Sequence, residues 1–267
     1  MTSGNGFVLD QADAMCSAKP VGVLSAIPEE MAAFGAHFRE SGRVTVGGLS
    51  VLLGALDGRP VALAESGIGK VNGALAATVL LDRFDCRGLI FSGVAGGVDP
   101  ALSVGDLVVA TRVIQHDYGA LSKGLVETYR AGAMPFPEYR GEAAFAADAC
   151  LIARAQTALD KGVRFGTVLT GDAYLACVET RERLFASFGG MAVDMESGAV
   201  AQVAEAFGRP WLIIRALSDL AGEDSQIDFL AFVHDAARNA AATVLKILPL
   251  FDLEGNAPAI ERPISRI

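Results

Sequence analysis

The sequence predicts one α/β domain with three layers, α/β/α, around a central mixed β-sheet. Short β-branched apolar runs alternate along the chain with alanine-rich amphipathic segments, and one pair of strands is joined by the turn dipeptide Asp57-Gly58. The 267 residues are 52% hydrophobic and 20% charged, which excludes a disordered protein. No repeat or Ser/Pro-rich linker divides the chain, so we expect a single domain over residues 20–250, between a disordered leader (1–19) and a polar tail (251–267).

The first half of the chain is expected to begin with a strand and a helix. The apolar run at 20–26 (PVGVLSA) is typical of a strand, and Met31, Phe34 and Phe38 then share one stripe of a helix expected over about 29–38. A hairpin of 44–55 and 60–66, a helix over about 70–84 and a wholly apolar strand at 88–92 follow in that order.

The second half continues the alternation. Residues 105–114 (GDLVVATRVI) and Trp211–Leu217 each predict a strand. Between and after them we expect a helix over 142–159, strands at 165–169 and 191–193, a helix over 196–207 and a last helix over 227–248. The segment 115–140 is too long for an ordinary connection, and such segments are usually lids, binding loops or oligomer contacts.

Charge and cysteine usage restrict the partners and the compartment. The net charge is −9 and the 22 Lys and Arg residues form no basic run, so we expect neither nucleic acid nor a membrane as partner. The absence of a signal pattern and of a run of about eighteen apolar residues favours a cytoplasmic protein. No His, Cys or Asp cluster has metal-ligand spacing, so we expect no metal and four buried free thiols: Cys16, Cys86, Cys150 and Cys177.

Acidic side chains follow several expected strands directly. Ligands bind at the carboxyl ends of strands in open α/β sheets, so these positions form the candidate site. They are Glu29 and Glu30, Asp194 and Glu196, and Asp219 with its neighbour Ser218. A solvated first-turn acid or a helix cap is the plain alternative for each. Glu196, however, shares a helical face with the apolar residues Val200, Val203 and Phe207, where a carboxylate needs a bonding partner.

Two glycine-rich turns, 66–70 and 92–97, also follow strands. Gly67, Gly69 and Gly73 miss the dinucleotide spacing by one position, and Gly69-Lys70 lacks the spacing and the hydroxyl residue of a P-loop. We therefore expect no cofactor. The glycines of the second turn would instead let the main chain approach a ligand that lies over the sheet.

Taken in order, these segments resemble one known family. The segments VGVLSAIPEE (21–30), ESGIGKVNGALAAT (65–78), IFSGVAGGVDPALSVGDLVVA (90–110), TGDAY (170–174), AVDMESGAVAQVA (192–204) and IIRALSD (213–219) are similar to the methylthioadenosine/S-adenosylhomocysteine nucleosidases of the purine and uridine phosphorylase superfamily. The resemblance spans about residues 20–250. It implies a phosphorylase/hydrolase-like nucleosidase fold, usually a homodimer, that cleaves the N-glycosidic bond of 5′-thio-substituted adenosines.

The resemblance also implies a role for each matching position. Glu30 is similar to the base that activates the attacking water, and Asp219, with Ser218 nearby, to the acid that faces adenine N7. Glu196 is similar to the carboxylate that holds the ribose hydroxyls. The other implied contacts with the purine nucleoside are Met195 under the ribose, Tyr174 stacked on the base, Leu175 at the purine edge, and Val94, Ala95 and Gly96 in the glycine turn.

Elementary chemistry fits this division of roles. Adenine leaves poorly as an anion, so Asp219 would have to be protonated, which costs roughly 4 kcal/mol at pH 7 unless an apolar site raises its pKa. Glu30 would stay ionised to take a proton from water, and Glu196 would stabilise the ribosyl cation. A phosphorylase would hold a dianion with arginines, which are absent from residues 28–30 and 90–92. We expect hydrolysis, with a phosphate-dependent purine nucleoside phosphorylase as the alternative.

Several positions depart from the family pattern. Val94 stands where a serine is frequent, Asp194 replaces a glutamate, and Tyr174 carries a hydroxyl that phenylalanine lacks. The segment 115–140 departs most, and in relatives this region helps enclose the 5′ substituent, often across the dimer interface. We expect it near a homodimer interface, with Phe136, Pro135 and Met134 as candidates for that wall, although an apolar patch buried only for dimerisation fits equally.

Further alternatives follow from the same residues. His116, before Asp117, is a candidate for substrate or partner contact, whereas His37 and His234 are expected to be ordinary surface or core residues. A nucleoside-binding sensor without chemistry and a dinucleotide oxidoreductase are less favoured readings. Methylthioadenosine, S-adenosylhomocysteine, deoxyadenosine, adenosine and inosine all offer the N7 that Asp219 would face.

Overall fold

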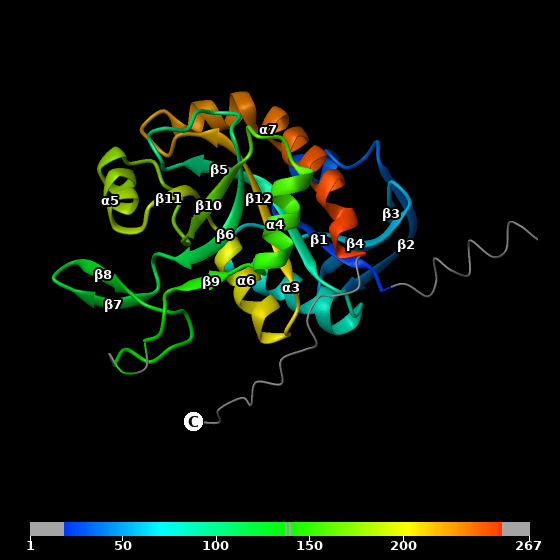
Figure 1. Cartoon of the computed structure of the whole chain (residues 1–267), viewed down its shortest axis with the longest axis horizontal. Coiled ribbons are helices and arrows are strands. Elements are labelled where there is room, and N and C mark those ends of the chain that lie inside the picture. Colours follow the sequence, from blue (N-terminus) through cyan, green and yellow to red (C-terminus); the bar gives the residue numbers. More distant parts are fainter. Residues whose placement is uncertain (1–18, 137, 139, 253–267) are drawn as a thin grey trace, which may run out of the picture.

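A ten-stranded mixed sheet runs through the molecule (Figure 1). The computed structural model describes residues 19–136, 138 and 140–252; nearly all of the expected leader and tail lies outside these residues. The main path of the sheet has the strand order β11-β10-β6-β12-β5-β1-β4-β3-β2, and β9 pairs with β6. Its strands are β1 (Val21–Ser25), β2 (Phe38–Val46), β3 (Leu49–Leu56), β4 (Arg59–Glu65), β5 (Leu89–Gly97), β6 (Leu107–Gln115), β9 (Ala144–Ala146), β10 (Arg164–Thr170), β11 (Gly190–Asp194) and β12 (Trp211–Asp219).

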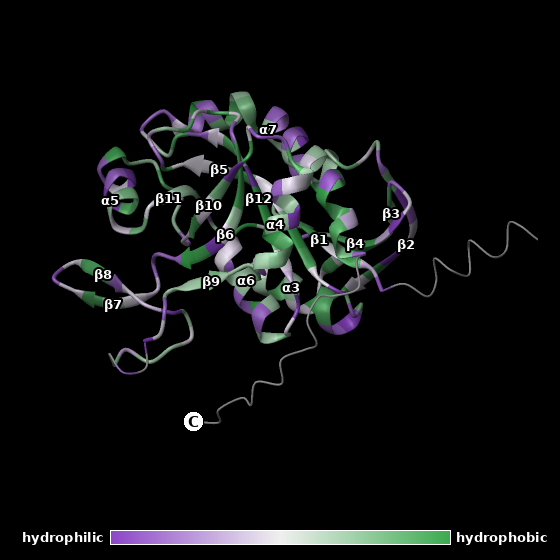
Figure 2. Cartoon of the chain, viewed as in Figure 1, coloured by the Kyte–Doolittle hydropathy of each residue, from purple (hydrophilic) through white to green (hydrophobic). Residues whose placement is uncertain are grey.

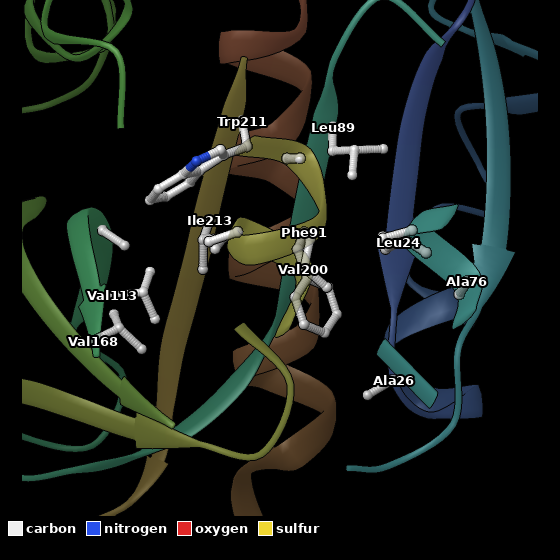
Figure 3. Close-up of a cluster of buried hydrophobic side chains, with 14 of the residues drawn as sticks. Leu24, Ala26, Ala76, Leu89, Phe91, Val113, Val168, Val200, Trp211 and Ile213 are labelled. Carbon is white, nitrogen blue, oxygen red and sulfur yellow. The ribbon is translucent and has the colours of Figure 1, made fainter. Parts of the chain in front are cut away.

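Two hydrophobic clusters join the helices to this sheet. One contains side chains of α3 (Lys70–Arg83) and α6 (Ser197–Ala206), and the other contains side chains of α4 (Ala149–Ala158) and α7 (Ser225–Ile247). Strand β1 alternates between them, since Leu24 belongs to the first cluster and Val23 to the second. Figure 3 shows the first cluster, where side chains of β1, β5, β12, α3 and α6 meet. The expected α/β fold with a mixed sheet is confirmed.

Part of the sheet closes on itself. Strand β11 pairs in parallel with β10 and also antiparallel with β5, through Ala192 with Gly97 and Val193 with Gly96. Strands β5, β12, β6, β10 and β11 therefore form a closed ring of five, which a purely layered arrangement does not contain. The closure brings the ends of β5, β11 and β12 together, and Asp219 is in register with Gly96.

Near the N-terminus the expected helix over 29–38 is wrong in its extent. Helix α2 covers only Pro28–Ala32, and Phe38 begins β2. The apolar residues that suggested a longer helix are used in two other ways: Phe34 is buried in the turn that follows α2, and the Phe38 ring packs on Gly54 of β3. The expected strand 44–55 is likewise divided, because Gly47 and Gly48 have positive φ values and turn β2 back into β3.

The segment around residues 142–159 also differs from expectation. Phe145 lies in the short strand β9 beside β6, and the helix begins only after Asp148, whose Oδ1 accepts a hydrogen bond from the Leu151 N–H at 2.7 Å. Helix α5 (Val178–Phe188) was not expected, nor was the hairpin of β7 (Gly119–Ser122) and β8 (Leu125–Thr128) within the long segment. The remaining predicted helices and strands are present near their expected bounds, with β5 longer than expected.

The cysteine prediction is only partly correct. Cys86 is buried, Cys177 is partly exposed and Cys150 is exposed, and all three are free; Cys16 lies outside the described residues. Cys150 is exposed because it sits in the first turn of α4, whose inward face is formed by Leu151, Ile152 and Ala155. Within the described residues no group of acidic, His or Cys side chains has the geometry of a metal site, and no helix is long and apolar enough to cross a membrane.

Candidate active site

A cavity of about 270 Å³ opens where β1, β5, β11 and β12 end. Seventeen residues line it: Ala26, Ile27, Glu30, Ile68, Val94, Ala95, Gly96, Ala173, Tyr174, Leu175, Val193, Asp194, Met195, Glu196, Ser218, Asp219 and Phe229. They include the predicted acids Glu30, Asp194, Glu196 and Asp219 and all the predicted nucleoside contacts except Phe136, whereas the candidates Glu29, Met134 and Pro135 do not line the cavity. The lining is mostly apolar, and the carboxyl groups of Glu30, Glu196 and Asp219 are buried in it.

Glu30 is held by backbone amides. It follows β1 on the short helix α2, and its Oε2 accepts hydrogen bonds from the N–H groups of Ala26 at 2.6 Å and Ile27 at 3.3 Å. Its Oε1 accepts one from the Val94 N–H at 2.8 Å. Burial raises the pKa of Glu30, while Arg215 and these amides act in the opposite direction. The carboxyl group is thus fixed through both of its oxygens.

Glu196 is the cap residue before α6 and not a residue of its apolar face. Its Oε1 accepts a hydrogen bond from the Gly69 N–H at 2.8 Å, so the first glycine turn supplies the partner that a buried carboxylate needs. Its Oε2 lies 3.9 Å from Arg215 Nη2. Burial and the neighbouring charge of Asp194 raise the pKa of Glu196 to about 7 against the opposing effect of Arg215.

Asp219 ends β12 at the other side of the cavity. Its Oδ1 accepts a hydrogen bond from the Ala221 N–H at 2.8 Å, and its Oδ2 accepts one from Ser218 Oγ at 3.0 Å. Burial raises the pKa of Asp219, and the negative charge of Asp228 adds to this effect. A carboxyl group in this setting retains its proton to higher pH than a solvated one.

Arg215 is a site residue that the sequence reasoning missed. Its side chain is 1% exposed, with Nε 2.6 Å from Asp194 Oδ2, Nη2 3.0 Å from Ser197 Oγ, and the guanidinium 3.9 Å from the centre of the Phe91 ring. A Cβ on Gly93 would lie within 2.6 Å of both Arg215 Nη1 and Glu30 Oε1, so glycine is required there. A charged residue in the apolar strand IIRALSD was the signal that could have identified it.

Two other predicted residues lie apart from the cavity. Phe136 is 51% exposed and does not line the cavity of its own chain. His116 is packed against the backbone of Gly171, where an added Cβ would be 2.4 Å from its Nε2, and it does not line the cavity either. Conversely, Ile68 and Phe229 line the cavity and were not predicted. Phe229 lies on α7 in a stretch that reads only as amphipathic helix, so the sequence pattern did not separate it from core residues.

The sequence and the fold of this chain are similar to those of known proteins. The family model of the phosphorylase superfamily matches residues 20–249. The 5′-methylthioadenosine/S-adenosylhomocysteine nucleosidase of Mycobacterium bovis is 44% identical over 247 residues, covering 86% of this chain and 97% of the relative, and that of Marinomonas sp. is 36% identical, covering 85% and 97%. The structure of the S. pneumoniae nucleosidase with a transition-state inhibitor, MT-ImmA, has a TM-score of 0.77 at 32% identity and covers 86% of this chain and 98% of its own.

The match over residues 20–249 shows that this chain, with its mixed sheet closed between β5 and β11, belongs to the phosphorylase superfamily. Within it, the chain belongs to the family of 5′-methylthioadenosine/S-adenosylhomocysteine nucleosidases, which are N-glycosyl hydrolases.

Proposed function

We propose that this chain hydrolyses the N-glycosidic bond of adenosine-type nucleosides, such as 5′-methylthioadenosine or S-adenosylhomocysteine, and releases adenine and the ribose derivative. The observation that carries the proposal is the meeting of three buried carboxyl groups, from Glu30, Glu196 and Asp219, around one mostly apolar cavity. The family membership supports it, since the relatives compared above are named as nucleosidases of these two compounds.

Asp219 acts as the acid in this proposal. As the bond between C1′ and N9 breaks, the electron pair moves into adenine, and the Asp219 proton passes to N7 so that the base leaves neutral. The raised pKa of Asp219 supports this role, because burial and the nearby charge of Asp228 favour the protonated carboxyl group.

Glu30 and Glu196 act on the sugar side. Glu30 takes a proton from the water that attacks C1′, and Glu196 accepts hydrogen bonds from the ribose hydroxyls and stabilises the positive charge that develops on the ribosyl ring. Both carboxyl groups are held at fixed positions by backbone amides, Glu30 by Val94 and Ala26 among others and Glu196 by Gly69. Fixed acceptors of this kind need little reorganisation during the reaction.

The remaining lining residues set the position of the nucleoside. Tyr174 stacks on adenine, Leu175 and its backbone frame the purine edge, and Met195 lies under the ribose. Val94, Ala95 and Gly96 bring the main chain of β5 close to the sugar. The support for these roles is that all of these residues line the same cavity as the three acids.

Water is the nucleophile in this proposal, in spite of the arginine beside Glu30. The Arg215 guanidinium already donates to Asp194 and Ser197, and Glu30 and Glu196 also act on its charge. A phosphate dianion placed at Glu30 would meet the carboxyl groups of Glu30, Asp194 and Glu196. The one cation there, Arg215, is already paired with these groups, so the net repulsion favours water.

Adenine release from 5′-methylthioadenosine, measured in phosphate-free buffer and again with added phosphate, tests the proposal. We expect equal turnover in both buffers and the free ribose derivative as second product. Turnover that requires phosphate and yields a ribose 1-phosphate would instead assign the chain as a purine nucleoside phosphorylase.

We also propose that the chain forms a homodimer with the segment 115–140 near its interface. Figure 2 shows apolar colour on β8, in the hairpin that projects from the body of the molecule. Exposed apolar side chains gather on this segment: Leu121, Leu125, Val126, Met134 and Phe136. Phe136 would then reach a 5′ substituent only across the interface. Light scattering should give twice 27.7 kDa for the protein and a lower mass for Leu121→Ser/Phe136→Ser; a monomer of the natural sequence contradicts the proposal.

Three further expectations belong to this proposal. They are the three-layer α/β/α arrangement for the open part of the sheet, one domain over residues 20–250, and a cytoplasmic location. The hydrophobic clusters of α3 with α6 and of α4 with α7 support the first, and the span of the family match, 20–249, supports the second.

A further inference from the structure

Lys70, Asp117 and Asp172 form an ion-pair network next to the cavity, and none of them lines it. Lys70 Nζ is 2.7 Å from Asp117 Oδ1 and 3.6 Å from Asp172 Oδ2. Asp117 Oδ2 also accepts a hydrogen bond from the backbone N–H of Asp172 at 2.9 Å. The three residues come from the start of α3, the turn after β6 and the loop after β10, so the network joins three segments that are distant in sequence.

The same network connects two walls of the cavity. The Gly69 N–H binds Glu196 Oε1 at 2.8 Å, and the N–H of the next residue, Lys70, binds Asp172 Oδ1 at 2.8 Å. Asp172 stands two positions before Tyr174 in a loop that lines the cavity. Consecutive amides of one turn therefore hold the carboxyl group of Glu196 and the loop that carries Tyr174.

Close packing leaves this junction little freedom. Gly69 has a φ of +99°, a backbone conformation that side-chain-bearing residues rarely adopt. On the other side, the backbone of Gly171 lies directly on the His116 ring. The Lys70 side chain is only 17% exposed, so its charge is partly shielded from solvent, and its pairing is stronger than that of a fully exposed ion pair.

We propose that Lys70, Asp117 and Asp172 are positioning residues. They set the separation between two walls of the cavity: the ribose wall, which holds Glu196, and the base wall, which is the loop 171–175 with Tyr174. None of the three lines the cavity. They act through the contact of Gly69 with Glu196 and through the loop 171–175. The names of the two walls rest on the proposed function, whereas the geometry of the network does not.

Lys70→Met is the primary test, because it removes the cation and leaves two carboxylates side by side. Their repulsion moves the loop 171–175 while the three acids of the site remain. We expect KM for 5′-methylthioadenosine to rise about tenfold and kcat to change less than about threefold. The double variant Lys70→Met/Asp117→Asn removes one of the two opposing charges and should bring KM back to within about threefold of the natural protein.

A matched control separates this effect from the loss of any lysine. Lys246→Met breaks the exposed ion pair with Asp160, 2.6 Å long and far along α7 from the cavity, and should leave KM unchanged. If Lys70→Met lowers the unfolding temperature but leaves KM unchanged, the network is only a structural ion pair and the proposal is overturned. Failure of the double variant to restore KM overturns it as well.

Hydrogen–deuterium exchange of the ligand-free proteins keeps this test independent of the activity. The amides of residues 171–175 should exchange faster in Lys70→Met and return toward the natural rate in the double variant. If the natural protein releases no adenine, the proposed function fails, and the exchange rates still decide the positioning network. Unchanged exchange in Lys70→Met contradicts it.

Discussion

The two ends of the cavity treat their carboxyl groups differently. At one end Glu30 and Glu196 lie near the buried guanidinium of Arg215, which opposes the rise in pKa that burial causes. At the other end Asp219 has a hydroxyl and an amide as donors, and the charge that acts on it, Asp228, raises its pKa further. Burial therefore raises the pKa of all three acids, but Arg215 opposes this rise at one end of the cavity, whereas at the other end the charge of Asp228 adds to it.

The backbone explains how a cation can be placed at one end only. Arg215 is in register with Gly93 on the neighbouring strand β5, where the lack of a side chain leaves room for both the guanidinium and Glu30. Four positions further along β12, Asp219 pairs in register with Gly96. The strand therefore places the buried Arg215 beside Glu30 and Glu196, behind the residues that line the cavity, and places Asp219 in the lining itself.

Asp219→Asn should give the largest effect in this comparison. The amide cannot deliver a proton to N7, so we expect kcat for adenine release to fall by about 10³–10⁴-fold, with folding retained because Asn can still accept the Ala221 N–H. Steady-state kinetics with 5′-methylthioadenosine measure the loss.

A substrate whose leaving group needs no protonation is the control for that variant. With 4-nitrophenyl riboside, hydrolysis by Asp219→Asn should fall by less than about tenfold, because nitrophenolate leaves as an anion. An equal loss on both substrates would show that Asp219 does not act as the acid.

Arg215→Met tests the end of the cavity that contains Glu30 and Glu196, and it should lower the free energy of unfolding. Removing one partner of a buried pair leaves Asp194 as an uncompensated buried charge, so we expect the free energy of unfolding to fall by about 3–5 kcal/mol in urea titrations. Adding Asp194→Asn should recover part of this loss. Arg209→Met, which breaks an exposed pair with Asp85, is the matched control and should cost about 1 kcal/mol or less. A similar small loss in both variants would mean that Arg215 does not neutralise the site.

Much of the fold could be predicted from local pattern. Strands such as β1 and β12 contain mostly apolar runs, and α3 and α7 have long amphipathic patterns, so period and composition were enough. The extent of α2 and the existence of β9 could not be predicted, because Phe34, Phe38 and Phe145 are apolar in either state and only tertiary contacts decide between helix, turn and strand. The closure of β11 onto β5 depends on pairing between distant segments, which local pattern does not encode.

The candidate site likewise contains some residues that the sequence predicts and others that it does not. The acids were predictable because they stand directly after strands and match an ordered set of family motifs. Arg215 was not predictable, because it lies inside a strand and its partner Asp194 is 21 positions away in the sequence. Only the fold brings Arg215 Nε to 2.6 Å from Asp194 Oδ2. The partner of Glu196, the Gly69 amide, is a backbone group and leaves no residue-type signal in the sequence.

The pH dependence of activity sharpens the contrast between the two ends. Glu196, with a pKa of about 7, and Glu30, with a raised pKa, must be ionised, so kcat/KM should fall as the pH drops through about 7. Asp219 must be protonated, and its raised pKa extends the range over which it keeps the proton, so loss of that proton lowers kcat/KM as the pH rises. The expected profile is a bell, and its alkaline side should disappear in Asp219→Asn. An activity that stays flat from pH 5 to 9 would contradict both assignments.

Stability of the ligand-free protein should depend on pH with the opposite sign. The folded pKa of Glu196 is raised from 4.5 to about 7, so its contribution is fully present below 4.5 and is lost as the pH rises through about 7. The unfolding temperature should therefore decrease over this range while activity increases. Glu196→Gln should flatten this slope; an unchanged slope would mean that another group causes it.

Val94→Thr should have the smallest effect, because the contact of residue 94 with Glu30 is made by its backbone. The Val94 N–H lies 2.8 Å from Glu30 Oε1, and threonine keeps that N–H and nearly the same side-chain volume. Residue 94 lines the cavity, and one further hydrogen bond from an added hydroxyl would be worth about 1 kcal/mol at most after desolvation. We expect kcat/KM to stay within about threefold of the natural value. A gain of more than about tenfold would show that a hydroxyl at this position helps to orient the attacking water, and that the amides around Glu30 do not orient it alone.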